Sequence, residues 1–360
     1  MSTALAPASV TELVEVVRSY PRLLAFGAGT KARLSAVNAT RISVSQLRGI
    51  VEYEPSEFTF TALAGTPVRE LVRTLAERGQ YLPFDPLLTD AGATLGGTIA
   101  AGVSGPGRLR FGGLKDFILG VQFVDGLGRA LRMGGKVVKN AAGFDVPKFL
   151  VGSLGRFGVL TELTFKVFPL PASTLTLKLA AGDIEAATRI LVEAANSRWE
   201  THALDILPGA YDVCMRLGGP AQALQEIADD VFARWPGEKL GDVDAEKIWS
   251  DLREFRWVHA DRPLIKIALM PTFIPPLYRA VQRFEGLRIH VSSGGNMAFV
   301  SLAAPKQAVE LNELLRNLSL SGVTLRGEAP LWCGLQPRAE IAQAVKHALD
   351  PENRFPPLHE

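Results

Sequence analysis

Hydrophobic and polar residues early in the chain follow the spacings of short helices and strands. Residues 9–18 place apolar side chains on one helical face, and Ser9 is followed by Glu12 in the pattern of a capping box. Residues 67–78 have the same helical spacing and are closed by Gly79. Strand patterns are predicted at residues 22–26, 41–47 and 58–63. This part of the chain therefore mixes helices with strands.

A glycine-rich segment between Leu82 and Gly113 interrupts these patterns. Large side chains are scarce in it, but apolar residues such as Leu95 and Ile99 and the lack of charge runs argue against disorder. We interpret it as backbone that must approach another group closely. Strand patterns follow at residues 117–124, 130–133 and 158–168.

Beyond Pro171 strands and helices interleave. Strands are predicted at residues 174–179, 265–269 and 290–302, and helices at residues 184–195, 221–234 and 307–318. This order predicts a second, smaller α+β domain in which helices cover one face of a sheet.

Composition narrows the class of protein. A chain of 360 residues with 47% hydrophobic residues suggests about two domains, and a net charge of +2 gives no footprint for nucleic acid. No apolar run reaches the ~18–20 residues of a membrane span, and the first residues lack a signal-peptide pattern. The two cysteines, Cys214 and Cys333, exclude a disulfide framework. We therefore expect a cytoplasmic protein.

One glycine motif has competing interpretations. Gly27, Gly29 and Ala32 match the relaxed dinucleotide fingerprint, with Glu52 about twenty residues later. A nicotinamide Rossmann fold is disfavoured, because the strand pattern that begins near Arg41 leaves no room for a crossover helix. Taken alone, the motif is also compatible with a structural turn that binds nothing.

An ordered set of motifs carries more information than any one of them. The set is Gly27-Ala28-Gly29-Thr30, Pro83-x-Asp85-Pro86, Ala93 to Ala100, Gly105 to Gly112, Asp116 to Gly120, Lys139 to Asp145 and Gly152 to Thr161. In this order it resembles the two-part FAD-binding domain of the vanillyl-alcohol-oxidase (p-cresol methylhydroxylase, PCMH) family over nearly all of residues 20–171. The resemblance implies an α+β fold in which this FAD-binding domain is joined to a smaller cap domain.

Glycine-rich turns suit this cofactor, because bare backbone N–H groups can surround an anion. We expect one such turn from Gly27 to Thr30 and another from Thr94 to Gly97 to bind the pyrophosphate. By resemblance, the FAD site comprises Gly27, Ala28, Gly29, Thr30, Lys31, Pro86, Gly92, Thr94, Leu95, Gly96, Gly97, Gly102, Gly105, Gly107, Asp116, Gly158, Val159 and Leu160. Two structural alternatives stay open: a tight turn at residues 152–158 and a surface ion pair of Lys139 with Asp145.

Covalent attachment of the flavin is not expected. Members of the family that tether it use histidine or cysteine, and the first such residues here, His202 and Cys214, follow the flavin region. The resemblance therefore implies non-covalent FAD.

Within the family, residues 82–120 and 139–153 resemble most the flavoproteins of 2-hydroxy acids, in particular the smaller FAD-binding component of bacterial glycolate oxidases. This implies oxidation of glycolate to glyoxylate, with electrons passed through flavin to a larger flavin subunit and an iron–sulfur subunit. Attachment to the inner face of the membrane would come through those partners. The C-terminal Asp350-Pro351-x-Asn353-x-Phe355 resembles the family's terminal loop, although Pro356 replaces the usual Asn.

The metal-binding stretches of longer hydroxy-acid dehydrogenases are not preserved. Their histidine positions correspond to Val291, Ala298 and Ala329, which leaves only Glu328 of the ligand set. One carboxylate does not hold such a metal, so no metal is expected. His290, one position out of register, is interpreted as an ordinary strand residue.

The catalytic base is not predicted. Arg108, Arg110 and Lys139 are candidates to bind a carboxylate, with surface roles as the alternative. We expect an FAD-binding domain at residues 1–171, a cap domain at 172–325 and a segment at 326–360 that returns to the first domain. Three functions stay open: an FAD-dependent oxidoreductase subunit of a glycolate oxidase complex, a stand-alone 2-hydroxy-acid dehydrogenase, and a non-catalytic structural subunit.

Overall fold

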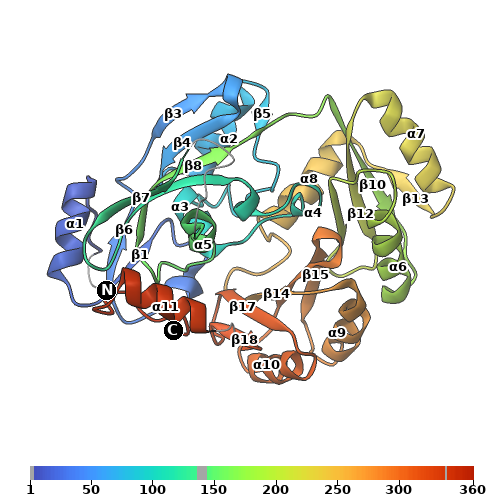
Figure 1. The fold of residues 1–360 in the computed structure, drawn as a ribbon. Coiled ribbons are helices and arrows are strands. Elements are labelled where there is room, and N and C mark those ends of the chain that lie inside the picture. The colour runs from blue at the N-terminus through green and yellow to red at the C-terminus, as the bar shows by residue number, and fades with distance from the viewer. Residues whose placement is uncertain (1–3, 136–143, 337–338) are drawn as a thin grey trace. The chain divides into compact units, whose positions relative to one another are not determined.

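The computed structural model describes residues 4–135, 144–336 and 339–360. It divides into two compact units (Figure 1). Unit 1 combines residues 1–104, 113–170 and 338–360, and unit 2 combines residues 105–112 with 171–337. Both contain helices and sheets, as the predicted α+β class requires.

Unit 1 begins with a small parallel sheet. The helix α1 (Val10–Ser19) is capped by Ser9, whose hydroxyl accepts a hydrogen bond from the Glu12 N–H group. The strands β1 (Leu23–Phe26) and β2 (Thr40–Ser43) pair in parallel, and the 3₁₀ helix η1 (Ala32–Ser35) lies between them in sequence. Because only this short turn joins them, they do not form the βαβ unit of a Rossmann fold.

A five-stranded antiparallel sheet is the largest sheet of unit 1. Its strand order is β3 (Ile50–Glu54), β4 (Thr59–Leu63), β8 (Val159–Lys166), β6 (Ile118–Val124) and β7 (Ala130–Gly134). The remaining elements of the unit are η2 (Pro55–Glu57), α2 (Val68–Ala76), β5 (Gln80–Tyr81), α3 (Leu95–Ala101), η3 (Leu114–Asp116), α5 (Val146–Leu150) and β9 (Phe168–Pro169). The pairing of β4 with β8 brings residues 59–63 beside residues 162–166, so the unit is built from distant parts of the sequence.

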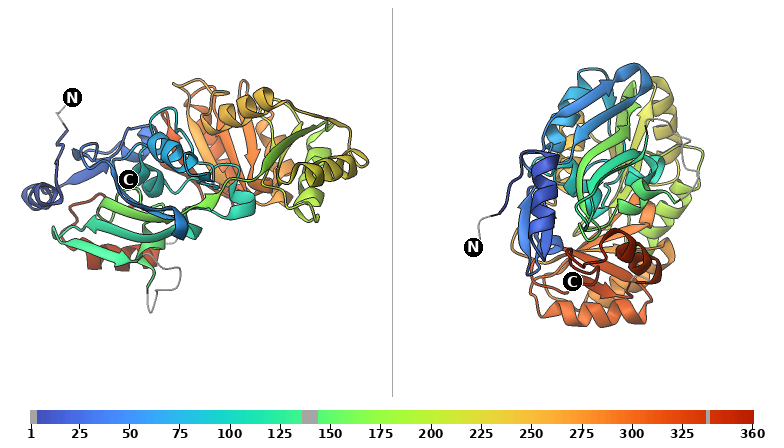
Figure 2. Two further views of the ribbon diagram at one scale, coloured as in Figure 1. Left: turned by 90° about the horizontal axis from the view of Figure 1, so that it is seen from above. Right: turned by 60° about the vertical axis from the view of Figure 1, so that its left-hand side comes forward.

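The C-terminal helix α11 (Ala339–Leu349) belongs to unit 1. Figure 1 and Figure 2 show it in red against the green strands of this unit. The carbonyl of Leu349 accepts a hydrogen bond from the Gly126 N–H group at 2.8 Å, and the carbonyl of Arg354 accepts one from the Leu23 N–H group at 2.7 Å.

Unit 2 is a nine-stranded antiparallel sheet with helices. The strand order is β13 (Gly237–Lys239), β10 (Ser173–Leu179), β12 (Val213–Gly219), β11 (Ala203–Ile206), β15 (Arg288–Ser292), β16 (Met297–Ser301), β14 (Leu264–Ala268), β17 (Ser321–Arg326) and β18 (Trp332–Gly334). One face forms a continuous apolar core with α6 (Ile184–Ala195), α7 (Ala221–Phe232), α9 (Ile274–Val281) and α10 (Gln307–Asn317). On the other face α8 (Asp242–Arg253) inserts the buried Trp249 beside Cys214. The unit also contains α4 (Arg108–Phe111), η4 (Pro271–Phe273) and η5 (Ser293–Gly295).

The units differ from the predicted ranges in two places. Residues 105–112 belong to unit 2, and residues 326–337 also belong there because β18 pairs with β17. The single strand predicted at residues 290–302 is wrong: it is a hairpin of β15 and β16. Gly294 and Gly295 turn the chain with φ values of 65° and 90°, which side chains other than glycine rarely adopt.

Candidate cofactor site

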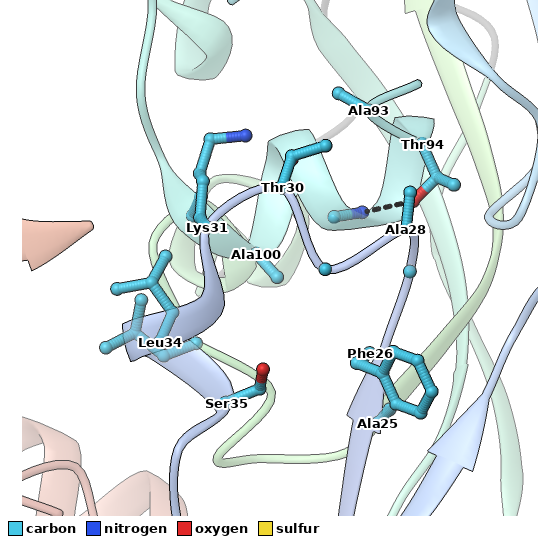
Figure 3. Close-up of a pocket in the computed structure, with 15 residues that line it drawn as sticks. Ala25, Phe26, Ala28, Thr30, Lys31, Leu34, Ser35, Ala93, Thr94 and Ala100 are labelled. Carbon is cyan, nitrogen blue, oxygen red and sulfur yellow. Dashed lines mark hydrogen bonds between the residues drawn. The ribbon is translucent and has the colours of Figure 1, made fainter. Parts of the chain in front are cut away.

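The loop that follows β1 borders a hollow in unit 1 (Figure 3). The hollow is open to solvent. Residues 27–31 line one side of it, and Thr94, Gly97, Ala100 and Leu154 line the rest together with residues of η1. The structure thus brings two of the predicted glycine-rich motifs together.

The loop presents unused hydrogen-bond donors. Among the described residues, the backbone N–H groups of Ala28, Gly29 and Thr30 find no acceptor. Gly29 has a φ of 72°, and a Cβ atom placed on it would meet no atom within 4 Å. Neighbouring N–H groups at an open turn are a suitable site for a phosphate or diphosphate. The loop therefore fits the pyrophosphate of a dinucleotide.

Gly27 lets the loop pass close to α3. A Cβ atom at Gly27 would overlap the Oγ1 atom of Thr94. Thr94 caps α3, since its Oγ1 accepts a hydrogen bond from the Gly97 N–H group at 3.2 Å (Figure 3). Glycine is therefore required at position 27 for packing against this cap.

The second motif contributes fewer donors than the sequence suggested. The Leu95 N–H group donates to the Thr66 carbonyl at 2.9 Å, and the Gly96 N–H group donates to the Ala64 carbonyl at 2.8 Å. With the Gly97 N–H group on Thr94, three of the four donors of this turn have acceptors within the protein. Close packing explains the motif instead, because a Cβ at Gly96 would lie 2.7 Å from that of Ala64.

The donors of this turn that remain available to a ligand belong to Thr94. Its backbone N–H group has no acceptor in the part of the chain that the structure describes, and its hydroxyl can still donate a hydrogen bond. These two groups lie across from the Gly27–Lys31 loop.

A second hollow shares Gly27, Gly97 and Ala100 with the first. Val44, Ala64, Gly158 and Leu160 line it, together with Gly96 and Gly97. Val159 instead points into the core that α1 and Phe355 share and is fully buried there. Of the predicted 158–160 segment, Gly158 and Leu160 therefore lie at the candidate site.

Other predicted cofactor residues have structural roles. Gly102 ends α3 with a φ of 64°, and its Cβ would lie 2.8 Å from the Cα of Gly152. The Asp116 carboxylate accepts a hydrogen bond from the Gly113 N–H group at 2.8 Å. Lys31 is buried and lines the first hollow. Pro86 and Gly92 lie in the loop before Thr94, and Gly105 and Gly107 precede α4 in unit 2.

The three cationic residues that were proposed to bind a carboxylate have different environments. Arg110 forms an ion pair with Glu200 at 3.0 Å, and Lys139 lies outside the described residues. Asp145, its suggested partner, pairs with Lys148 at 3.1 Å. Arg108 is near a residue that the sequence did not single out, Lys266 of β14.

Lys266 lies in an unusual environment. Burial, reinforced by the positive charge of Arg108, lowers the pKa of Lys266 to about 8. No carboxylate among the described residues forms an ion pair with Lys266 or Arg108. The detectable sequence signal was the single lysine within the otherwise apolar strand predicted at residues 265–269.

The positions of the missing metal ligands lie in the core. Val291 and Ala298 face each other across β15 and β16 on the helix-covered side of the sheet. His290 lies on the opposite side and shares a hydrogen bond of 2.8 Å with the buried Asp205. Within residues 4–135, 144–336 and 339–360, no three His, Cys, Asp or Glu residues are grouped to hold a metal ion.

Comparison with known proteins gives a consistent picture. Residues 2–134 match the model of an FAD binding domain. The chain is similar to glycolate oxidase subunit GlcE of Escherichia coli, with 36% identity over 69% of this chain and 68% of that protein. It is 31% identical to glycolate oxidase subunit GlcD of Bacillus subtilis over 39% of this chain, but it spans only 30% of that subunit.

A solved structure supports the fold independently. An alkyldihydroxyacetonephosphate synthase superposes with a TM-score of 0.68 over 97% of this chain and 75% of its own, at 16% identity. None of the described helices is both long and apolar enough to cross a membrane.

Proposed function

Because the chain belongs to the family of glycolate oxidase subunit GlcE, within the PCMH-type FAD-binding proteins, we propose that it is an FAD-dependent subunit that oxidises glycolate to glyoxylate. The observation that carries this proposal is the row of unused N–H groups at Ala28, Gly29 and Thr30 beside Thr94. Bound FAD would supply the acceptor for the hydride that leaves the α-carbon of a hydroxy acid.

We assign the pyrophosphate to the Ala28–Thr30 loop and to the N–H and hydroxyl groups of Thr94. Gly27, Gly96 and Gly97 allow the backbone segments around it to pack closely. The side chain of Lys31 and the hollow beside Gly158 and Leu160 complete the site that we assign to the cofactor. We propose that the flavin is bound non-covalently, because no histidine or cysteine precedes His202.

A 2-hydroxy acid also needs a partner for its carboxylate. We assign this role to Lys266 with Arg108, since two neighbouring cations without an ion-paired carboxylate suit an anionic substrate. Arg110 is a weaker candidate because Glu200 already neutralises it.

We propose that electrons leave through partner subunits, a larger flavin subunit and an iron–sulfur subunit. Two cysteines do not suffice for an iron–sulfur cluster, which needs about four ligands. This requirement favours a working complex over a stand-alone dehydrogenase.

The first test is the absorbance spectrum of the purified chain, followed by heat denaturation. About one FAD per chain, released into solution by heating, is the expected result. A colourless chain that does not take up added FAD would contradict the proposal and favour a structural subunit.

A second test separates the two enzymatic alternatives. Glycolate and an artificial electron acceptor are added to the chain alone and to the chain with its partners. We expect turnover only in the complex, whereas full turnover by the chain alone would identify a stand-alone dehydrogenase.

A further inference from the structure

Arg156 is a fully buried arginine in the turn between α5 and β8. Its Nη1 group donates to the carbonyl of Leu154 at 2.9 Å, and its Nη2 group donates to the carbonyl of Leu34 at 3.1 Å. The planar guanidinium thus joins two backbone segments that are distant in sequence.

Both segments belong to the wall of the proposed FAD site. Leu34 lies in η1, next to the Gly27–Lys31 loop, and Leu154 lines the same hollow (Figure 3 shows Leu34). The N–H group of Leu154 also donates to the Ala100 carbonyl of α3 at 2.9 Å. One side chain therefore holds η1 in place relative to α3.

The backbone of Arg156 is connected to the C-terminal segment. Its carbonyl accepts a hydrogen bond from the Lys346 Nζ group at 2.7 Å. The same ammonium donates to the Phe355 carbonyl at 2.7 Å and to the buried carboxylate of Asp350 at 2.5 Å. Asp350 in turn accepts the N–H groups of Arg354 and Phe355 at 2.9 and 2.8 Å.

Burial of the charged Arg156 side chain costs free energy. Burial lowers the pKa of Arg156 to about 10, although the carboxylate of Glu360 raises it in part. Its Nε group has no partner among the described residues. Apolar residues can often replace buried charges without loss of stability. Stability alone therefore does not explain this arginine, whereas its two hydrogen bonds to carbonyl groups do.

We infer that Arg156 is a positioning residue of the flavin site, through which docking of the segment 339–360 increases the affinity for FAD. The inference rests on the proposal that FAD binds beside the Gly27–Thr30 loop. Because linkage is reciprocal, bound FAD also stabilises the docked C-terminal segment.

The test measures the FAD dissociation constant and the melting temperature of the apoprotein for four variants. Arg156→Met removes both hydrogen bonds to the carbonyl groups, and Arg156→Lys keeps the positive charge but not the two donor groups of the guanidinium. Lys346→Met removes the hydrogen bond that joins Arg156 to α11. The control is Tyr53→Phe, since the Tyr53 hydroxyl donates to Oε1 of Gln80 at 2.8 Å, a bond of unit 1 that lies outside the segment 339–360 and outside the lining of the hollow.

We expect Arg156→Met to weaken FAD binding at least tenfold and Lys346→Met several-fold, with Arg156→Lys between wild type and Arg156→Met. Tyr53→Phe should lower the melting temperature slightly but leave the dissociation constant within twofold. An Arg156→Met protein that binds FAD as tightly as wild type would overturn the inference.

A second measurement does not depend on the variants folding. Amide hydrogen exchange of wild type is compared with and without FAD, and we expect FAD to slow the Arg354 and Phe355 amides at least tenfold. Unchanged exchange at saturating FAD overturns this inference alone. A wild-type chain that binds no FAD overturns the proposed function together with it.

Discussion

At the scale of single residues, Gly27 controls how closely the loop after β1 approaches Thr94. We predict that Gly27→Ala weakens FAD binding at least ~10-fold, about 1.4 kcal/mol, because the added methyl group displaces the cap of α3. Fluorescence titration with FAD measures the effect. Gly182→Ala is the matched control, since a Cβ there meets no atom within 4 Å. Equal losses in both variants would contradict this role of Gly27.

Lys266 gives a prediction about pH. The ammonium binds an anion only when protonated, and its pKa lies near 8, so affinity for glycolate should fall as pH rises through 8. Lys266→Met should raise the KM for glycolate in the complex and flatten this pH profile, while FAD content stays unchanged. The exposed Lys239 provides the control Lys239→Met. A pH profile that survives in Lys266→Met would contradict the assignment.

The same residue predicts a change in stability. The pKa of Lys266 is lowered by folding, so the unfolded chain binds more protons between pH 8 and about 10.4, and stability rises with pH across this window. Lys266→Met should therefore be more stable than wild type at pH 7, with an advantage that shrinks between pH 8 and pH 10. Urea unfolding at several pH values measures this. A variant less stable than wild type at pH 7 would refute the argument.

At the scale of elements, Asp205 joins β11 to the β15–β16 hairpin. Its carboxylate accepts hydrogen bonds from His290 and Ser292 at 2.8 Å and from the Ser293 N–H group at 3.0 Å. Asp205→Ala leaves these buried donors without an acceptor, and we predict a loss of about 3 kcal/mol in the free energy of unfolding. Asp212→Ala, which breaks a more exposed pair with Lys178, should cost less than ~1 kcal/mol. Similar losses would argue against the role of Asp205.

Local signals in the sequence predicted most elements, and the two failures have different causes. The capped helix α1 and the family motifs were legible in the sequence, and the α+β fold and the family are confirmed. The β15–β16 hairpin was missed because its turn interrupts an apolar run that resembles one strand. The acceptors of the Leu95 and Gly96 N–H groups could not be foreseen, since they are carbonyls about thirty positions earlier.

At the scale of the whole molecule, FAD should stabilise unit 1. A ligand that binds only the folded state adds about 2.7 kcal/mol at a hundred times its dissociation constant. We therefore expect calorimetry of the apoprotein to show an unfolding transition that moves to higher temperature with added FAD, and Gly27→Ala should reduce that shift. No shift at saturating FAD would contradict the assignment of the cofactor to this unit.

Unit 1 is assembled from segments on both sides of unit 2 in the sequence. During synthesis the ribosome makes residues 1–170 first, and then the larger part of unit 2, before it reaches α11 and Asp350. Until then the growing chain lacks the groups that contact Arg156, Leu23 and Gly126. The nascent polypeptide therefore carries an incomplete first unit until its last segment is translated, and we expect the apolar surface of that unit to stay accessible to chaperones during this interval.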